Sequence, residues 1–189
     1  MYRFSVLFSM FYVLLFANGA FAESQEDKLR NNLPEIRSAL MQQDIVGTLR
    51  TYNKARHDMT QTDIEGLEAI WRAELGSGNQ PLITGIVRNI TALRMRKVIR
   101  DTGRVVSEIN VIDARGVSIA QTTVFPHIRG MAGEAGNIAA ADPNMVLISS
   151  VDSQASDKSR QLEAFLPVID PDTNELIGAV ILVIEGESF

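Results

Sequence analysis

The stretch FLPVIDPDTNELIGAVILVI, from Phe165 to Ile184, decides the fold of this chain. Two apolar runs flank the turn-forming residues PDTN at 171–174, which is the pattern of two neighbouring antiparallel strands. The second run, LIGAVILVI at 176–184, contains no polar residue, so both faces of that strand must be buried. Such a strand belongs in the middle of a sheet that is covered on both sides.

Other segments have the β-branched and apolar character of strands. Residues 106–113 and 117–122 predict a hairpin around a turn that ends at Gly116. Residues 145–151 and 161–169 predict two more strands, separated by a polar turn. With the strand that ends at Ile184 these make five, and we expect them to form one antiparallel sheet.

The N-terminal part has helical periodicity instead. Apolar residues recur at spacings of three to five from Glu23 to Met59, which predicts one long helix with a first turn or kink at Pro34. Thr62–Glu65 resembles a capping box, and the helix that it starts ends at Gly76. A third helix is predicted from Pro81 to Asp101. The chain is therefore predicted to be α+β, with helices covering one face of the sheet.

A long loop is predicted between the first hairpin and the third strand. Residues 124–144 contain three glycines and two prolines and show little periodicity, apart from one short helix predicted at about 134–141. Loops of this length in a compact domain are usually functional or disordered. We expect this loop to roof the second face of the sheet and to enclose a small cavity there.

The first 22 residues have the features of a signal peptide. Arg3 precedes an apolar stretch at 4–17, and Ala20-Phe21-Ala22 suits cleavage after Ala22. The alternative is an uncleaved signal anchor, but Asn18-Gly19 interrupts the stretch before it reaches the roughly 20 apolar residues that span a bilayer. We therefore expect an exported, periplasmic protein.

Length and composition indicate one globular domain. The chain has 189 residues, of which 46% are hydrophobic and 22% charged. Its net charge of −5 makes nucleic acid an unlikely partner, and the lack of cysteine excludes disulfides and thiolate metal sites. We divide the chain into a signal peptide (1–22), an N-terminal helix (23–60) and a folded domain (61–189).

Residues for catalysis are hard to assemble from this sequence. His57 and His127 lie far apart and lack metal-ligand spacing, and neither a nucleophile elbow nor a phosphate-binding loop is present. Asp113, Asp170 and Asp172 all fall in hairpin turns, where aspartate caps local backbone groups. We therefore predict no catalytic residues, no metal and no cofactor.

Several short motifs resemble those of one family. Together with the leading helices and the long loop, they resemble the extracytoplasmic PAS-like sensor domains called Cache or PDC domains, over about Ile64 to Glu185. The motifs that carry the resemblance are Ile109-Asn110-Val111-Ile112-Asp113 with Gly116, Thr122-Thr123, Pro167-Val168-Ile169-Asp170 and Ile177-Gly178-Ala179-Val180.

Free-standing exported members of that family are the most similar. They carry a Trp-Arg-x-Glu helix before the sheet, and this chain has Trp71-Arg72-Ala73-Glu74. After the Thr-rich strand those members have a stretch of the type Tyr-Trp-Gln-Gly-Asp-Glu-Ala, whereas residues 127–135 here are HIRGMAGEA. The pocket aromatics that the resemblance implies are missing, which indicates a different ligand or a degenerate pocket.

The resemblance implies a fold and a role. The fold is a PAS-like five-stranded antiparallel sheet with long N-terminal helices on one face and a small-molecule site on the other. The role is signalling, and the signal must pass through another protein, because the chain ends at Phe189 without a second membrane helix or a kinase. Amino acids, carboxylates and amines are the ligands that the family implies.

Polar residues of the long loop and its neighbours are the candidates for ligand binding. An arginine of the third helix is added because it could reach over the sheet to an anionic ligand. Trp71 is added as well, and the alternative role for its side chain is to pack in the core against the sheet. The candidate residues are Trp71, Arg94, Thr122, His127, Arg129, Glu134 and Phe165.

Two interpretations of function follow. The first is an exported, non-enzymatic sensor module that binds a small organic ligand and signals through a membrane-bound receptor partner. The second is an interaction or accessory module without a small ligand, whose N-terminal helix docks on a receptor or forms a homodimer. It is suggested by the apolar spacing of Leu29, Leu33, Ile36 and Leu40, which exceeds what packing on a small sheet requires.

Overall fold

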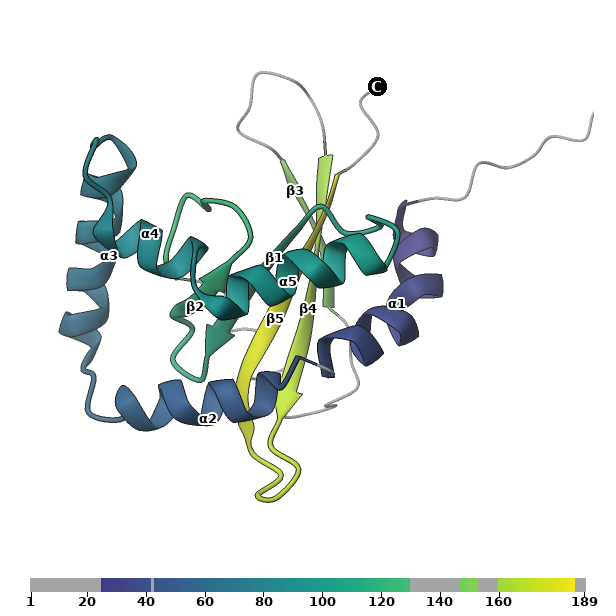
Figure 1. Ribbon diagram of the computed structural model, residues 1–189, viewed down its shortest axis with the longest axis horizontal. Helices are drawn as coiled ribbons and strands as arrows, with labels where there is room; N and C mark the ends of the chain where they lie inside the picture. The colour runs from purple at the N-terminus through teal and green to yellow at the C-terminus, as the bar shows by residue number, and fades with distance from the viewer. Residues whose placement is uncertain (1–24, 42, 130–146, 153–159, 186–189) are drawn as a thin grey trace, which may run out of the picture.

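The computed structural model describes residues 25–41, 43–129, 147–152 and 160–185 (Figure 1). The predicted signal peptide lies outside these residues, as does the predicted short helix at 134–141. The helices are α1 (Gln25–Met41), α2 (Ile45–Ala55), α3 (Gln61–Leu75), α4 (Pro81–Val87) and α5 (Ile90–Asp101). The strands are β1 (Glu108–Asp113), β2 (Ser118–Gln121), β3 (Leu147–Asp152), β4 (Arg160–Ile169) and β5 (Leu176–Glu185).

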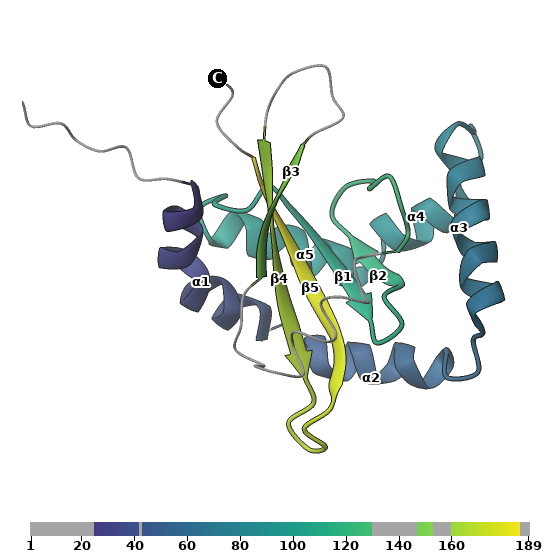
Figure 2. The same ribbon diagram turned by 180° about the vertical axis from the view of Figure 1, so that it is seen from behind.

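The strands form one antiparallel sheet in the order β2-β1-β5-β4-β3. Helices α1, α2 and α5 lie against one face of it, and α3 and α4 lie beside the β2 end (Figures 1 and 2). The predicted α+β class, the sheet of five antiparallel strands and the helices on one face are therefore confirmed. The bounds of all five strands agree with the predicted bounds to within a few residues.

Strand β5 occupies the centre of the sheet, as its apolar sequence predicts. It pairs with β1 on one side and with β4 on the other. Its residues from Ile177 to Ile184 are all buried, whichever face they point to. A central strand has hydrogen-bonded neighbours on both sides, and here both of its faces are buried. Polar side chains would therefore be buried without water, so apolar residues are favoured along its whole length.

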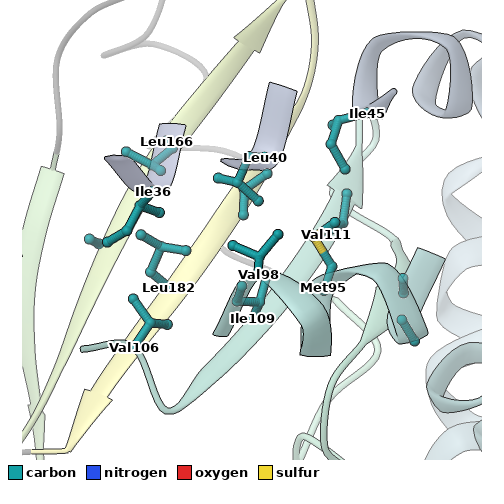
Figure 3. Close-up of a cluster of buried hydrophobic side chains, with 14 of the residues drawn as sticks. Ile36, Leu40, Ile45, Met95, Val98, Val106, Ile109, Val111, Leu166 and Leu182 are labelled. Carbon is teal, nitrogen blue, oxygen red and sulfur yellow. The ribbon is translucent and has the colours of Figure 1, made fainter. Parts of the chain in front are cut away.

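The main core lies between the sheet and the helices α1, α2 and α5 (Figure 3). Helix α1 contributes Leu29, Ile36 and Leu40, all at most 5% exposed, and Leu33 packs against the same cluster. These are the residues whose spacing suggested a docking surface. The structure places them in the core, so their apolar character serves the fold and gives no support to a docking role for α1.

The predicted long N-terminal helix is wrong in one respect, because it is divided into α1 and α2. Asp44 adopts a left-handed conformation with φ of 52°, and its side chain accepts a hydrogen bond from Gly47 N at 3.2 Å. Aspartate tolerates this conformation and caps the new helix. Pro34 lies inside α1 and does not end it.

The predicted third helix is also two helices, α4 and α5. Asn89 separates them, and its side-chain oxygen accepts from Ala92 N at 2.8 Å to cap α5. Its amide nitrogen donates to Ile119 O at 2.7 Å, which ties the junction to β2. The capping box of α3 is formed by Thr60 and Asp63, two residues before the predicted one, and α3 ends at Gly76 as expected.

A second, smaller core joins α3 and α4 to the β2 end of the sheet. Trp71 is completely buried there, in contact with a cluster that includes Val117 and Ile128 from the segments flanking β2. Glu74 is buried as well, and its carboxylate accepts from Leu82 N and Ile83 N at 3.1 and 2.9 Å, at the start of α4. Among the described residues, none of the helices combines the length and apolar character needed to cross a membrane.

Candidate ligand-binding face of the sheet

The face of the sheet opposite α1, α2 and α5 is called the second face here. Side chains alternate along a strand, so the register assigns residues to it directly. In one row across the sheet Asn110 pairs with Ile181, which pairs with Phe165. In the next row Ile112 pairs with Ala179.

The floor of the second face is apolar. Ile112, Phe165, Ala179 and Ile181 form a separate buried cluster, each at most 9% exposed. It comes from the three central strands β1, β5 and β4. A buried apolar floor of this kind can hold the apolar part of a small organic molecule.

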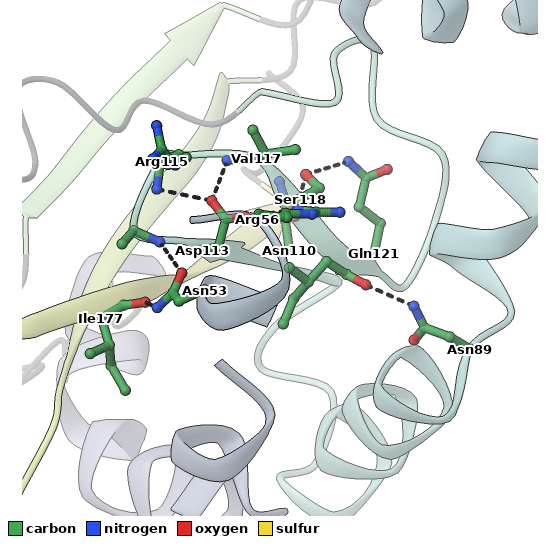
Figure 4. A network of polar contacts seen from close by, with 12 residues as sticks. Asn53, Arg56, Asn89, Asn110, Asp113, Arg115, Val117, Ser118, Gln121 and Ile177 are labelled. Atoms are coloured by element: carbon green, nitrogen blue, oxygen red, sulfur yellow. Dashed lines mark hydrogen bonds and ion pairs between the residues drawn. The ribbon is translucent and has the colours of Figure 1, made fainter. Parts of the chain in front are cut away.

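Three polar side chains of β1 and β2 border this floor (Figure 4). Ser118 Oγ donates to Asn110 Oδ1 at 2.9 Å, and Gln121 Nε2 donates to Ser118 Oγ at 2.9 Å. All three are at most 3% exposed. Gln121 also donates to His127 O and accepts from Phe125 N, both at 3.2 Å, so it fixes the chain that follows β2.

Two carboxylates lie in the row of the second face next to that of Asn110, Ile181 and Phe165. Glu108 and Glu163 both pair with Val183, from opposite sides of β5. Burial raises the pKa of Glu163, and the negative charge of Glu108 raises it further. The side chains that the structure describes make no hydrogen bond or ion pair to either carboxylate, so a cationic group placed between the two would be stabilised.

Of the predicted site residues, Phe165 lies on the second face, in its apolar floor. Thr122 lies just after β2, where its hydroxyl accepts from Ile109 N at 2.8 Å and its carbonyl accepts from Arg96 Nε at 3.0 Å. Thr122 is thus used in joining β1, β2 and α5. Its predicted contact with a ligand remains a prediction.

Trp71 and His127 meet on the α3 side of the segment after β2. Trp71 Nε1 donates to Phe125 O at 3.0 Å, and His127 Nδ1 lies 2.7 Å from Glu68 Oε1. Burial acts to raise the pKa of Glu68, but hydrogen bonds from His127 and Arg72 outweigh it and lower that pKa. These contacts fasten the start of the long loop to α3.

The other predicted residues are dispersed. Arg94 lies on the helix side of the sheet, where Nη1 donates to Gln43 O at 3.3 Å, so it does not reach over the second face. Arg129 is exposed and bridges to Val117 through its backbone. Glu134 lies outside the described residues. Trp71 and His127 therefore both take part in joining α3 to the segment after β2, while Arg94 and Phe165 have other partners.

Both hairpin turns are held by α2 and its C-cap residue Arg56, and Figure 4 shows the first of them. Asp113 Oδ1 accepts from Arg115 N and Val117 N, and its Oδ2 accepts from Arg56 Nη1 at 2.7 Å. Asp170 plays the same part in the second hairpin, where Oδ2 accepts from Arg50 Nε at 2.7 Å. The predicted capping role is confirmed for Asp113 and Asp170, whose Oδ1 accepts from Asp172 N, and Arg56 and Arg50 add to it. Asp172 instead accepts from Arg50 Nη2 at 2.5 Å.

Acid should weaken the hold of α2 on the second hairpin. Hydrogen bonds from Arg50, and then from the backbone of Asp172, keep the pKa of Asp170 well below its usual value of 3.8. Because this pKa is lower in the folded protein than in the unfolded chain, the ionised carboxylate of Asp170 stabilises the folded state. That stabilisation is complete above about pH 3.8 and is lost progressively as the pH falls further. Asp170→Asn should therefore reduce the free energy of unfolding at about pH 7 and have less effect at about pH 3. Urea unfolding at both pH values measures the change in the free energy of unfolding, and Asp58→Asn, at an exposed position, is the control. An equal loss of stability in Asp170→Asn at the two pH values would contradict the prediction.

Groups of three or more His, Cys, Asp or Glu side chains able to hold a metal are absent from the described part of the chain. Asn110, Ser118, Gln121 and Glu163 were not predicted as site residues. Their signal in the sequence is a polar side chain at an inward-facing position of a strand, which is visible only once the two faces have been assigned.

Comparison with known proteins gives distant structural likenesses only. No family model matches the chain, and no curated protein matches it. The sensor domain of the histidine kinase DctB from V. cholerae matches with 19% identity and a TM-score of 0.37, over 83% of this chain and 57% of that one. The ligand-binding domain of the Campylobacter jejuni chemoreceptor Tlp3, solved with 4-methylisoleucine, matches with 14% identity and a TM-score of 0.36, over 85% and 60%.

An extracellular ligand-binding receptor from Desulfohalobium retbaense also matches, with 16% identity and a TM-score of 0.35, over 79% of this chain and 25% of that one. This chain thus spans between a quarter and about 60% of the length of these structures. The three matched structures are a sensor domain of a histidine kinase, a ligand-binding domain of a chemoreceptor and a ligand-binding receptor.

Proposed function

We propose that this protein is an exported, non-enzymatic sensor module that binds a small organic molecule on the second face of its sheet and signals through a separate membrane-bound partner. The observation that carries the proposal is the composition of that face. An apolar floor around Ile181 is bordered by the buried amides of Asn110 and Gln121 and by the carboxylate of Glu163. Apolar walls with a few fixed polar groups are typical of small-molecule sites.

The charge of the face favours one class among the ligands considered. Glu108 and Glu163 lie on either side of Val183, and a negative ligand would add a third like charge. An ammonium group would instead offset both carboxylates and lower the raised pKa of Glu163. We therefore infer that the ligand is an amine or an amino acid bound through its ammonium group, in preference to a simple carboxylate.

A thermal-shift screen of amines, amino acids and short carboxylates tests the proposal. A ligand at a hundred times its dissociation constant adds about 2.7 kcal/mol to stability, which raises the melting temperature measurably. We expect an amine to do so, and Glu163→Gln to reduce its affinity about tenfold or more. The matched control is Glu175→Gln, at an exposed position in the turn before β5.

Three results would count against the proposal. If no compound of the library raised the melting temperature of a well-folded protein, the claim of ligand binding would be contradicted. A hit whose affinity is unchanged in Glu163→Gln would place the ligand elsewhere. In that case His127→Ala and Arg129→Ala test the loop residues that the sequence suggested. A partner that crosslinks equally well with and without the identified ligand would contradict signalling by ligand-dependent contact.

A further inference from the structure

Two surfaces away from the second face are exposed and complementary. One is a cleft of about 530 Å³ between the end of α2 and the start of α3, here called the α2–α3 cleft. The other is a strip along the outer side of α5, here called the α5 strip, formed by Ile90, Leu93, Lys97 and Arg100. Figure 1 shows α3 at one side of the molecule and α5 lying across the helix layer.

The α2–α3 cleft has apolar walls and a negative rim. Met59, Leu67 and Ile70 line it, and Ile70 is 51% exposed. Its charged lining residues are Arg56, Asp58 and Asp63.

The positive charge in the cleft is already paired. Arg56 Nη1 lies 2.7 Å from Asp113 Oδ2, and both side chains are largely buried. Asp58 is 87% exposed and pairs with His57. Hydrogen bonds from Thr60 lower the pKa of Asp63 and keep it ionised. The charge that the cleft presents to an approaching surface is therefore negative.

The α5 strip has the opposite character. Ile90 and Leu93, one turn apart, are 61% and 52% exposed. Lys97 and Arg100 continue the same side of the helix toward its C-terminus. Lys97 pairs with Asp101, whereas Arg100 makes no ion pair with the described residues. An exposed apolar pair followed by an exposed arginine matches a cleft with apolar walls and exposed carboxylates.

We propose that the α5 strip of one copy of this chain docks in the α2–α3 cleft of a second copy. The partner is a second copy because this chain carries both complementary surfaces. Each copy uses a different surface, so the contact is heterologous and either closes into a ring or continues as a chain. This contact is independent of the proposed ligand site and involves neither α1 nor the second face of the sheet.

Sedimentation velocity of the purified protein, at several concentrations and two ionic strengths, tests the proposal. We expect species larger than the monomer that grow with concentration at about 0.02 M salt and weaken at about 0.5 M salt, because surface charges are screened. Arg100→Glu should weaken association about tenfold, and Asp58→Lys should do the same. The matched controls are Arg30→Glu and Glu35→Lys, charge reversals at exposed positions of α1.

Mixing the two variants is the decisive measurement. Arg100→Glu retains a negative cleft and Asp58→Lys retains a positive strip, so the mixture should associate more strongly than either variant does alone. Circular dichroism confirms that each variant is folded. A protein that stays monomeric at low salt, a mixture that fails to associate, or an Arg30→Glu effect as large as that of Arg100→Glu would overturn the proposal.

Discussion

Gly178→Ala should lower the free energy of unfolding by about 3 kcal/mol, because the added methyl group has nowhere to go. A Cβ at this position would overlap the carbonyl oxygen of Ile112 and lie 2.8 Å from Leu49 Cδ2. Gly178 is on the central strand, between its partners on β1 and β4, so neither the strand nor the carbonyl can shift without disturbing the ladder. Urea unfolding measures the loss.

Gly85→Ala is the matched control for that substitution. Gly85 lies within α4, and a Cβ there meets no atom within 4 Å. Replacing a helical glycine by alanine in open space should raise stability by about 0.5–1 kcal/mol. The same chemical change is thus expected to have opposite signs at the two positions. A Gly178→Ala protein as stable as the wild type would show that β1 and β5 are not packed as closely as described here.

Trp71→Ala should cost about 3–5 kcal/mol, the largest loss expected from a single truncation in this chain. Trp71 is completely buried in the second core, and its indole nitrogen also holds Phe125 O. Removing it leaves a cavity between α3 and the segment after β2. Because it is the only tryptophan in the chain, its fluorescence follows the unfolding of the wild type, and circular dichroism serves for the variant.

Trp71→Phe separates packing from hydrogen bonding at that position. Phenylalanine retains most of the buried apolar surface but leaves Phe125 O without its donor, so a loss of about 1–2 kcal/mol is expected. A loss in Trp71→Ala no larger than in Trp71→Phe would mean that the second core contributes little. In that case the segment after β2 would be held chiefly by Gln121 and Glu68.

The strands could be predicted from the sequence because each is short, apolar and bounded by turn residues. The absence of polar residues in β5 was enough to place it at the centre of the sheet. The two helix breaks could not be predicted in the same way. Asp44 and Asn89 are polar residues without a neighbouring proline or glycine that would mark a break, and their capping role depends on how the helices pack.

The candidate site was only partly predictable for a different physical reason. Polar residues in a loop are readily predicted to contact a ligand, because binding residues often lie on loops. Polar residues within a strand are instead expected to face solvent. Asn110 and Gln121 instead face inward, where they bond to each other through Ser118. Arg94 was predicted as a ligand-binding residue because of its charge, and that prediction is not supported. Its guanidinium donates to the carbonyl of Gln43 on the helix side of the sheet.

The central position of β5 has a consequence for how the chain reaches its native state. Strand β5 is the last of the five in sequence, yet it joins the pair β1 and β2 to the pair β3 and β4. During synthesis, which proceeds from the N-terminus, the pair β1 and β2 and the pair β3 and β4 have no common partner until β5 is available. Pairings this distant in sequence form slowly. We therefore expect the complete sheet to form only after β5 has been synthesised, so that the β1–β2 and β3–β4 pairs remain unjoined until the end of synthesis.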